Sequence, residues 1–510
     1  TRQTPYPPSC SNWLRAFCEV LFWSEREGKR ELEHTNYSYN LFKAPLAATF
    51  ERFRVQRLLR YAFAAVVVSA SVQLTLLPFL MVYFHRLSLA SVVLNIGVTL
   101  LMAAVAFFAA VALVVSQINA TLAAPFIDVT NGLNWLMVHS VDPFARAEIA
   151  SIRLPEYTGW AAALYVLYYM PLATIAICLR KWKPLDLPKK QDAKGRRTLV
   201  WLAVWCQVMA ICVLVVHPFS AITSDGELRI DFLDVGQGDA ALLTLPDNTT
   251  ILVDGGGRPG PFQSETSLSG ELQQPNRERR GIGESVVSEY LWWRGLDRID
   301  YLIATHADAD HIDGLNDVAR NFAVRAALVA RAPIRDPEFA KLSQTLGLKD
   351  IPVRVLGAGD ELRLGQVSLY VLWPQPSTGP HWASGNDDSI VLLLHFGSRK
   401  ILLTGDIEAR AENALVRQYE CSLASDLTKV AHHGSKTSST EGFVDAAGSH
   451  VAVASVGESS VFGHPHAEVV ERWKSAGAQF LMTGKSGMIT VITDGDDLEL
   501  KTFVNPRPFE

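Results

Sequence analysis

The sequence predicts α-helical transmembrane segments followed by a soluble α/β domain. Hydrophobic residues make up 49% of the 510 positions, but they concentrate before Ser220, in runs long enough to cross a bilayer. After Ser220, short apolar runs alternate with amphipathic ones, which indicates strands alternating with helices. One of these predicted strands ends in a cluster of His and Asp side chains, which is typical of a metal site.

Net charge and cysteine usage narrow the function classes. The formal net charge is −5, so the chain has no global basic field that would indicate nucleic-acid binding, and any DNA contact must use local patches. The 6 Cys residues form neither a disulfide framework nor a zinc ribbon. The sequence contains no Walker A pattern, so we expect no nucleotide cofactor and an external energy source for any transport.

The chain divides into three regions, residues 1–59, 60–219 and 220–510. The first is a polar or interfacial segment that starts at Thr1 without a signal peptide, so we expect the chain to begin inside a longer protein. Residues 50–60 within it are basic. They suit a helix lying on a membrane surface and a solvated linker equally well.

The second region carries four long apolar runs. A bilayer span needs about 20 apolar residues. The runs are residues 61–84, 88–117, 157–179 and 198–216. Residues 121–139 are only moderately apolar, which favours an interfacial or re-entrant helix. Asn95 lies within the second run, where a polar side chain either hydrogen-bonds to a packed helix or faces a water-filled path.

Clusters of basic residues set the expected topology. The loop at residues 180–197 is strongly basic, and the positive-inside rule places it in the cytoplasm. The last span then runs outward, and the soluble domain is extracytoplasmic. A second basic cluster at residues 52–60 also favours a cytoplasmic start, and four simple spans would then leave the soluble domain inside. Either residues 121–139 cross as well, or the first cluster is misleading.

The third region is expected to alternate strands and helices. Strands are predicted at residues 228–233, 240–245, 250–253, 299–304, 368–373, 389–395, 400–403, 427–431, 451–454 and 488–492. Helices are predicted at residues 284–294, 314–323, 337–345, 408–419 and 467–475. Residues 255–283, rich in Gly, Pro, Ser and Gln, are expected to form a flexible surface loop near the site.

Four metal-competent side chains lie within six residues directly after the predicted strand at 299–304. They are His306, Asp308, Asp310 and His311. A fold commonly presents a metal site where a strand ends at the edge of a sheet. The alternative is a polar loop in which Asp310 or Asp313 caps the next helix. A cap needs one such residue rather than four, so the pattern favours metal binding.

This stretch resembles the HxHxDH signature of the metallo-β-lactamase superfamily, with Asp308 in the place of the second His. Six further stretches resemble the C-terminal domain of the ComEC competence-protein family, in the family's order. They are D-V-G-Q-G-D (234–239), L-V-D-G-G (252–256), N-D-D-S-I-V-L (386–392), L-L-T-G-D (402–406), K-V-A-H-H-G-S (429–435) and F-G-H-P (462–465). Residues 76–121 resemble the end of the family's membrane region. The resemblance implies a metallo-β-lactamase-like αββα sandwich, with two sheets face to face and helices outside.

The resemblance also implies two divalent metal ions. It assigns His306 and Asp308 to one ion. It assigns His311 to the other, together with Asp310, which is also expected to be catalytic. Asp406 is the expected bridging carboxylate, and its alternative role is to cap the helix predicted at residue 408. Two ions close together suit phosphodiester hydrolysis, because they stabilise both the attacking and the leaving oxygen.

Further ligands follow from three of the other stretches. One of His432 and His433 is expected to bind metal but not both, because adjacent residues of a strand point to opposite faces. Asn386, Asp387 or Asp388 stands where the superfamily often has a further His. With Asp308, this departure makes the site richer in oxygen, which shifts the preference from zinc toward manganese or magnesium without excluding zinc.

Supporting roles are expected for five residues. Asp254 is expected to hold the metal ligands by hydrogen bonds. Asp239 either lies at the mouth of the site or belongs to a plain β-turn. Ser435 and Lys436 either hydrogen-bond to phosphate oxygens or form an ordinary polar loop. His464 is expected to contact the substrate or to donate a proton to the leaving oxygen.

The resemblance implies a multi-pass protein of the bacterial inner membrane that acts in DNA uptake. The membrane region would pass single-stranded DNA, with other competence proteins as partners, and the extracytoplasmic metal domain would hydrolyse the non-imported strand as a nuclease or phosphodiesterase. Two alternatives stay open. One is a membrane-anchored metallohydrolase of another phosphodiester, and the other is a transport component whose metal domain is only structural. The His-Asp stretch and Asp406 speak against the structural alternative.

Overall fold

The computed structural model describes residues 45–145, 151–180, 190–219, 224–257, 281–330, 336–376 and 385–504, with a few positions between 13 and 21. The chain forms two compact units, Thr1–Phe219 and Ser220–Glu510. Two expected features lie partly outside the described residues. Of the basic loop expected at 180–197, residues 181–189 lie outside, and residues 190–197 are helical, so the loop is shorter than the sequence predicts. Most of the flexible loop expected at 255–283 also lies outside.

The first unit consists of helices and one short two-stranded ribbon. Its elements are α3 (Pro45–Arg52), α4 (Val55–Phe84), β1 (Arg86–Ser88), α5 (Ser91–Ser116), α6 (Ala120–His139), α7 (Asp142–Ala145), β2 (Ser151–Arg153), α8 (Ala163–Arg180) and α9 (Lys190–Val216). Within the described ranges, four helical segments are long and apolar enough to cross a membrane, namely Val55–Phe84, Leu94–Ser116, Gly159–Arg180 and Thr198–Val216. The four predicted apolar spans are therefore confirmed as helices.

Helix α4 begins earlier than the sequence predicts. Arg54 has a left-handed backbone with φ of 57°, which separates α3 from α4. Arg57 and Arg60 therefore lie in the first turns of the long apolar helix itself. The prediction of a separate basic helix or linker at residues 50–60 is therefore wrong. Helix α3 contains the first residues of that stretch, and α4 contains the last.

Hydrogen bonds connect the helices of the first unit. The Tyr168 hydroxyl on α8 donates to the backbone oxygen of Leu74 on α4 at 2.6 Å. The Asn95 amide on α5 donates to Oγ of Ser69 on α4 at 3.0 Å. A polar side chain in an apolar helix is stabilised by such a partner on a neighbouring helix. The hydrogen bond to Ser69 therefore explains the polar side chain of Asn95 by packing between α4 and α5.

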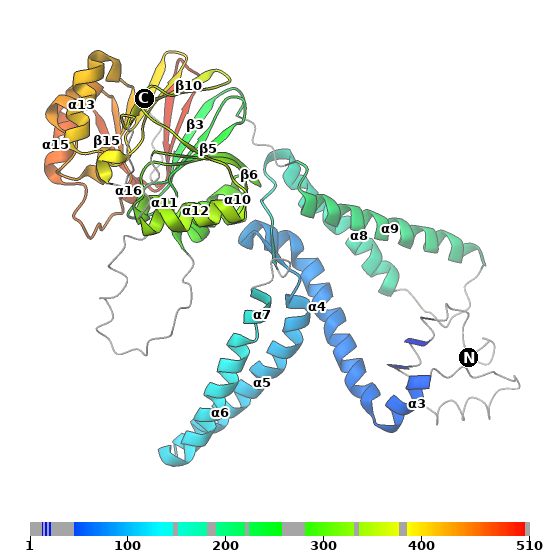
Figure 1. The fold of residues 1–510 in the computed structure, drawn as a ribbon. Coiled ribbons are helices and arrows are strands. Elements are labelled where there is room, and N and C mark those ends of the chain that lie inside the picture. The colour runs from blue at the N-terminus through cyan, green and yellow to red at the C-terminus, as the bar shows by residue number, and fades with distance from the viewer. Residues whose placement is uncertain are drawn as a thin grey trace, which may run out of the picture. The chain divides into compact units, whose positions relative to one another are not determined.

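Helices α5 and α6 form a hairpin in which α6 returns along α5 (Figure 1). Only Gln117 to Asn119 connect them, and the Asn119 side chain accepts hydrogen bonds from the first two backbone N–H groups after the start of α6. Helix α6 runs for 20 residues, which is about 30 Å at a rise of 1.5 Å per residue. That length matches the hydrocarbon thickness of a bilayer, although α6 is less apolar than the four segments that are apolar enough to cross a membrane.

The second unit is built on two β-sheets. Its strands are β3 (Leu228–Phe232), β4 (Ala241–Thr244), β5 (Thr250–Val253), β6 (Arg298–Ala304), β7 (Ala323–Val329), β8 (Val353–Val355), β9 (Glu361–Leu364), β10 (Val367–Trp373), β11 (Val391–Phe396), β12 (Arg399–Leu403), β13 (Leu427–Lys429), β14 (Val451–Ala454), β15 (Gln479–Met482), β16 (Ile489–Thr493) and β17 (Leu498–Thr502). One sheet has the order β17-β16-β3-β4-β5-β6-β7-β8, and the other has the order β15-β14-β13-β12-β11-β10-β9.

Helices cover the outer faces of both sheets. They are α10 (Glu289–Trp293), α11 (Ala309–Asn321), α12 (Pro337–Leu348), α13 (Ala409–Tyr419), α14 (Glu441–Ala447), α15 (Ala467–Ser475) and α16 (Thr483–Ser486). Figure 1 shows α11 and α12 on one side of the sheets and α13 and α15 on the other.

Three hydrophobic clusters separate these layers. Because side chains alternate along a strand, Leu243 of β4 joins the cluster between the sheets, while its neighbour Leu242 packs toward α11. Trp473 of α15 belongs to the third cluster, outside the other sheet. The predicted αββα sandwich is confirmed.

The structure agrees with the ten predicted strands to within one or two residues at each end. It adds two short helices, α14 and α16, and five strands that the sequence does not predict, namely β7, β8, β9, β15 and β17. Helix α11 begins at Ala309, before its predicted start at residue 314. Asp310 and His311 therefore lie in the first turn of a helix and not in a loop.

Candidate metal centre

Segments from both sheets bring the predicted metal ligands together. His306 follows β6, and Asp310 and His311 lie at the start of α11. Asp406 follows β12, and His433 follows β13, in the other sheet. The cluster therefore depends on the face-to-face packing of the sandwich, since neither sheet carries the whole set.

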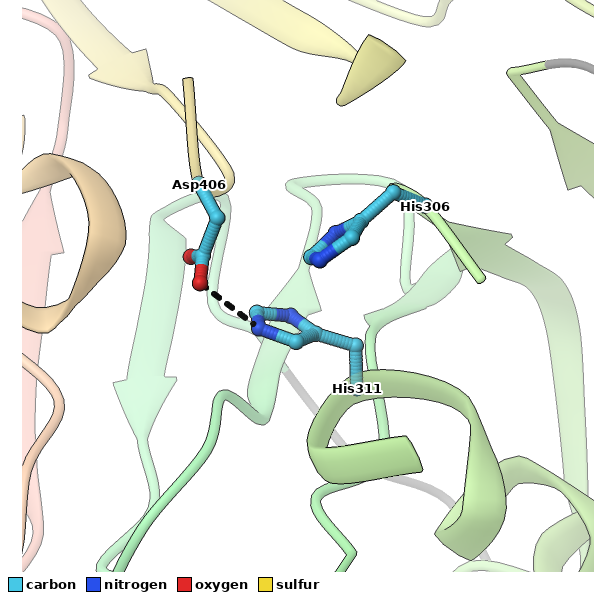
Figure 2. A group of neighbouring side chains, drawn as sticks. All are labelled: His306, His311 and Asp406. Carbon is cyan, nitrogen blue, oxygen red and sulfur yellow. Dashed lines mark ion pairs between the residues drawn. The ribbon is translucent and has the colours of Figure 1, made fainter. Parts of the chain in front are cut away.

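Asp406 lies at the centre of this cluster. Its Oδ2 atom is 3.1 Å from Nε2 of His311 and 3.1 Å from Nε2 of His433. Oδ2 of Asp310 is 3.6 Å from the same Nε2 of His433. The ring of His306 lies beside that of His311, with centroids 4.2 Å apart. Figure 2 shows His306, His311 and Asp406 converging on one point.

The donor atoms fit divalent metal ions. The Nε2 atoms of His306, His311 and His433 are buried and make no regular hydrogen bond. His306, His311 and Asp406 offer ligand atoms within 4.8 Å of one another, and so do Asp310, His311 and His433. Imidazole and carboxylate together suit zinc and manganese. These residues can therefore hold divalent ions in two groups that share His311.

The buried acids and imidazoles shift each other's pKa. Burial alone would raise the pKa of Asp406, but the charges of His311 and His433 hold it well below its usual range. Burial alone would lower the pKa of His311, yet the carboxylates of Asp406 and Asp254 raise it well above its usual range. The pKa of His433 is raised in the same way, by Asp406 above all. The carboxylates thus favour positive charge at the position where a metal ion would bind.

Asp254 fixes the orientation of His311. Its Oδ1 accepts a hydrogen bond from the backbone of Thr305 at 2.9 Å, and its Oδ2 accepts one from the Thr305 hydroxyl at 2.7 Å. Oδ2 also lies 2.9 Å from Nδ1 of His311. A carboxylate on Nδ1 leaves Nε2 as the atom that binds metal. The expected supporting role of Asp254 therefore has a defined geometry, on a buried residue with φ of 57°.

A buried lysine that the sequence reasoning missed lies behind Asp406. Nζ of Lys429 contacts Asp239, donates to the backbone oxygen of Gly405 at 3.0 Å and lies 3.4 Å from Oδ1 of Asp406. Burial would lower the pKa of Lys429, but Asp239 and Asp406 raise it. Asp239 also lies 3.4 Å from Nδ1 of His433, so it belongs to the site and not to a plain turn. The available clue was a lysine that is the only charged residue in the predicted strand at 427–431.

Asp406 does not cap α13, which was the alternative reading of this residue. The N-cap of α13 is Glu408. The backbone N–H of Asp406 donates instead to Oγ of Ser389 at 3.0 Å. Ser389 was not among the predicted site residues, although it belongs to the N-D-D-S-I-V-L stretch.

His432 and His433 differ, but not for the predicted reason. Strand β13 ends at Lys429, and both histidines have left-handed backbones, with φ of 48° and 54°. The alternation of side chains along a strand therefore does not apply. Nδ1 of His433 hydrogen-bonds to the backbone oxygen of Ser455 at 2.8 Å, which directs Nε2 toward Asp406. His432 lies outside this group, with Nδ1 3.2 Å from Glu408.

Three residues expected near the ions lie at the edge of the cluster. The Asp308 side chain is 48% exposed, although it stays 3.5 Å from Nε2 of His306. Asn386 donates to the Glu408 carboxylate at 3.2 Å. Asp387 accepts from the backbone of Glu408 at 2.9 Å and forms an ion pair with α13. Asn386 and Asp387 therefore stabilise the start of α13 and do not add oxygen ligands to the cluster.

The remaining predicted residues lie around the rim. Ser435 is buried, whereas Lys436 is exposed. The ring of His464 lies 5.6 Å from that of His432 and 6.4 Å from that of His433. Burial, and then the charges of His433 and His432, lower the pKa of His464 to about 4. His464 is therefore neutral at pH 7, which favours contact with a substrate over proton donation by an imidazolium.

Family comparisons match both units. Residues 233–458 match the family model described as "Metallo-beta-lactamase superfamily", and residues 40–183 match the model described as "Competence protein". The first match agrees with the sandwich of the second unit and supports a metal-dependent hydrolase. The second covers most of the helices of the first unit and supports a membrane protein.

Curated relatives share both regions. "ComE operon protein 3" of Bacillus subtilis (strain 168) is 26% identical over 431 residues, which is 83% of this chain and 51% of the relative. "Competence protein ComA" of Neisseria gonorrhoeae is 26% identical over 364 residues, which is 69% of this chain and 44% of the relative. The chain thus spans about half the length of the curated relatives it matches.

Solved structures that show a partial likeness to this chain include the metallo-β-lactamase fold protein YhfI from Bacillus subtilis. It is 11% identical, with a TM-score of 0.30, and the match covers 50% of this chain and 95% of that chain. Together, the two family matches and the curated relatives confirm the resemblance to the ComEC family.

Proposed function

We propose that this chain, which joins a competence-protein region to a metallo-β-lactamase domain in the manner of the ComEC family, acts in DNA uptake at a bacterial inner membrane. The membrane region passes one strand with the help of other competence proteins. The second unit hydrolyses phosphodiester bonds of the strand that is not imported. The observation that carries the proposal is the buried cluster of His306, His311, His433 and Asp406 in a chain whose other half matches competence proteins.

The chemistry of the cluster suits a phosphate group. Divalent ions, when bound, supply positive charge to the phosphate and to its attacking and leaving oxygens. Asp254 orients His311 and Lys429 orients Asp406, so these ligands are held in place before the substrate arrives. His464 stands at the rim, where a neutral imidazole can contact the substrate. None of these side chains is suited to reading base edges, so we expect little sequence preference.

The α5–α6 hairpin supports an extracytoplasmic position of the second unit. If α6 crosses the bilayer beside α5, the chain crosses five times through α4, α5, α6, α8 and α9. The basic residues at 52–60 and at 180–197 then both lie in the cytoplasm, as the positive-inside rule requires. The second unit emerges on the opposite side, where incoming DNA arrives.

The test is DNA hydrolysis by the full chain in detergent micelles. Single-stranded and double-stranded DNA of mixed sequence are incubated with manganese, magnesium or zinc. We expect metal-dependent cleavage without sequence preference that weakens as salt rises, because binding relies on phosphate charge. Asp310→Ala and Asp406→Ala should each lose metal and reduce cleavage at least about 100-fold, since each removes a ligand. Asp496→Ala, in the exposed turn between β16 and β17, is the matched control.

Three results would contradict the proposal. Turnover of a small phosphodiester with no attack on DNA under any metal would favour a membrane-anchored hydrolase of another substrate. Metal binding without hydrolysis of any phosphodiester would make the second unit a structural domain of a transport protein. DNA cleavage that survives Asp406→Ala would place the chemistry outside this cluster.

A further inference from the structure

A loop between β14 and α15, residues 457–465, stands at the rim of the metal cluster and is called the rim loop. Oγ of Ser460 in this loop donates to Oε1 of Gln237 at 2.9 Å, in the turn that carries Asp239. Just after the loop, the backbone N–H of His466 donates to the backbone oxygen of Gly434 at 2.9 Å. The rim loop is therefore fastened to the site on both sides, which fixes the position of its tip.

The tip of the rim loop presents two apolar side chains to solvent. Val461 is 77% exposed and Phe462 is 40% exposed. Exposed aromatic rings that are held in place beside a binding site commonly contact its ligand, because they bury a large area at a low entropic cost. The position of Phe462 next to a hydrolytic site therefore indicates a substrate contact.

Phe462 begins a row of rings that leads to the metal ligands. Its centroid lies 5.9 Å from that of His464, with 30° between the ring planes. His464 lies 6.4 Å from His433 with 26° between the planes, and Nε2 of His433 is 3.1 Å from Asp406. The row thus runs from the surface to the centre of the cluster, at angles that suit stacking. A group that stacks on Phe462 therefore lies at the outer end of this row, and a group held at Asp406 lies at its inner end.

We infer that Phe462 is a stacking platform for an unpaired nucleobase of the strand whose phosphate is held at the cluster, an inference that rests on the proposed function. An aromatic ring stacks on the face of any base, so the contact is independent of sequence. The formal net charge of −5 gives the chain little general attraction for DNA. Stacking supplies affinity that charge does not.

The platform selects single strands. Bases of a duplex are already stacked on one another, and an enzyme must unstack them before a protein ring can take their place. An unpaired base reaches Phe462 without that cost. The substrate class of the site is therefore single-stranded DNA, with duplex DNA as the poorer substrate.

The test compares two strands that differ only in their bases. The full chain in micelles with manganese cleaves a mixed-sequence single strand, or an abasic strand with the same number of phosphates, and kcat/KM is measured for each. A base stacked on an aromatic ring contributes about 1–3 kcal/mol, so Phe462→Ala should lower kcat/KM on the base-bearing strand about 5- to 150-fold. It should leave kcat/KM on the abasic strand unchanged. Phe462→Trp should keep the higher kcat/KM on the base-bearing strand.

Controls and contrary results separate this inference from the proposed function. Phe503→Ala removes another exposed phenylalanine of the same unit and should leave kcat/KM unchanged on both strands. If the wild type cleaves DNA but Phe462→Ala lowers kcat/KM equally on both strands, the ring only shapes the site. The inference then fails while the proposed function stands. If Phe462→Ala changes kcat/KM on neither strand, the ring contacts another surface, such as lipid, and the inference also fails. A wild type that cleaves neither strand but hydrolyses a small phosphodiester overturns both.

Discussion

Asp406 uses its two carboxylate oxygens for different partners. Oδ2 faces His311 and His433, and Oδ1 faces the ammonium of Lys429. The backbone of Asp406 is held in turn by Ser389. The carboxylate is therefore oriented by the protein before an ion binds, which reduces the reorganisation that binding requires.

Replacing Lys429 by Met tests this arrangement. The substitution leaves Asp239 and Asp406 as buried carboxylates without their cation, and breaking a buried ion pair costs about 3–5 kcal/mol. We expect the free energy of unfolding of the second unit to fall by about this amount in chelator. The loss should be smaller with saturating manganese, because the ion replaces part of the missing charge. Chemical unfolding followed by tryptophan fluorescence measures both values, with Lys400→Met on β12 as the control. Equal losses with and without manganese would show that Lys429 contributes packing alone.

His464 predicts a pH dependence of stability. Its ordinary pKa of 6.5 is lowered to about 4 in the folded chain, by burial first and then by the charges of His433 and His432. The unfolded chain therefore takes up a proton at His464 at a higher pH than the folded chain does. This difference costs no stability above about pH 6.5, and it destabilises the fold progressively as the pH falls from about 6.5 to about 4.

Unfolding of the wild type and of His464→Gln across that pH range measures the effect. We expect the variant to lose less stability than the wild type between pH 7 and pH 4. His450→Gln, an exposed histidine of the same unit, should follow the wild type. Parallel pH profiles of His464→Gln and the wild type would show that the pKa of His464 is not lowered.

The sequence predicted residue types better than residue positions. His306 and His311 could be identified because their types and spacing are local properties of one stretch. Asp308 has the same local pattern, but α11 begins directly after it, and its side chain lies at the edge of the cluster, 48% exposed and 3.5 Å from Nε2 of His306. Lys429 was missed because its partner Asp239 lies far away along the chain and approaches it only through the packing of the two sheets.

Among the elements, four of the five strands that could not be predicted share one property, and only β7 lies in the interior of its sheet. Strands β17, β8, β15 and β9 are the four edges of the two sheets, and the sequence missed all of them. An edge strand is partly solvated and short, so its sequence carries little apolar pattern, and its backbone pairing depends on a neighbour that is already in place. β8 is exposed at all three residues, whereas the interior strand β5 is buried throughout and was predicted with its correct ends.

The α5–α6 hairpin makes a prediction about topology. If α6 crosses the bilayer, the turn at Ile118 lies in the cytoplasm, whereas Val141, just beyond α6, lies outside. In single-cysteine variants on intact cells, a membrane-impermeant maleimide should therefore label Val141→Cys and not Ile118→Cys. Phe219→Cys, at the end of the first unit, should be labelled like Val141→Cys. Labelling of Ile118 and Val141 from the same side would show that α6 does not cross.

For the whole molecule, metal binding and stability of the sandwich are linked. The ligands come from both sheets, so an ion binds the assembled second unit and not its separated halves. A ligand at 100 times its dissociation constant stabilises the folded state by about 2.7 kcal/mol. We expect manganese or zinc to raise the thermal midpoint of the second unit, and His433→Ala to reduce that shift. Scanning fluorimetry with and without chelator measures it, and an equal shift in His433→Ala would place the bound ion elsewhere.

The division of the ligands between the two sheets also affects how the protein is made. His306, Asp310 and His311 leave the ribosome well before Asp406 and His433, and the two groups meet only when the halves of the sandwich close. A chain whose synthesis or translocation has not yet passed His433 holds only part of the ligand set. If the second unit hydrolyses nucleic acid as proposed, that activity arises only after both halves of the sandwich have been made and have packed together.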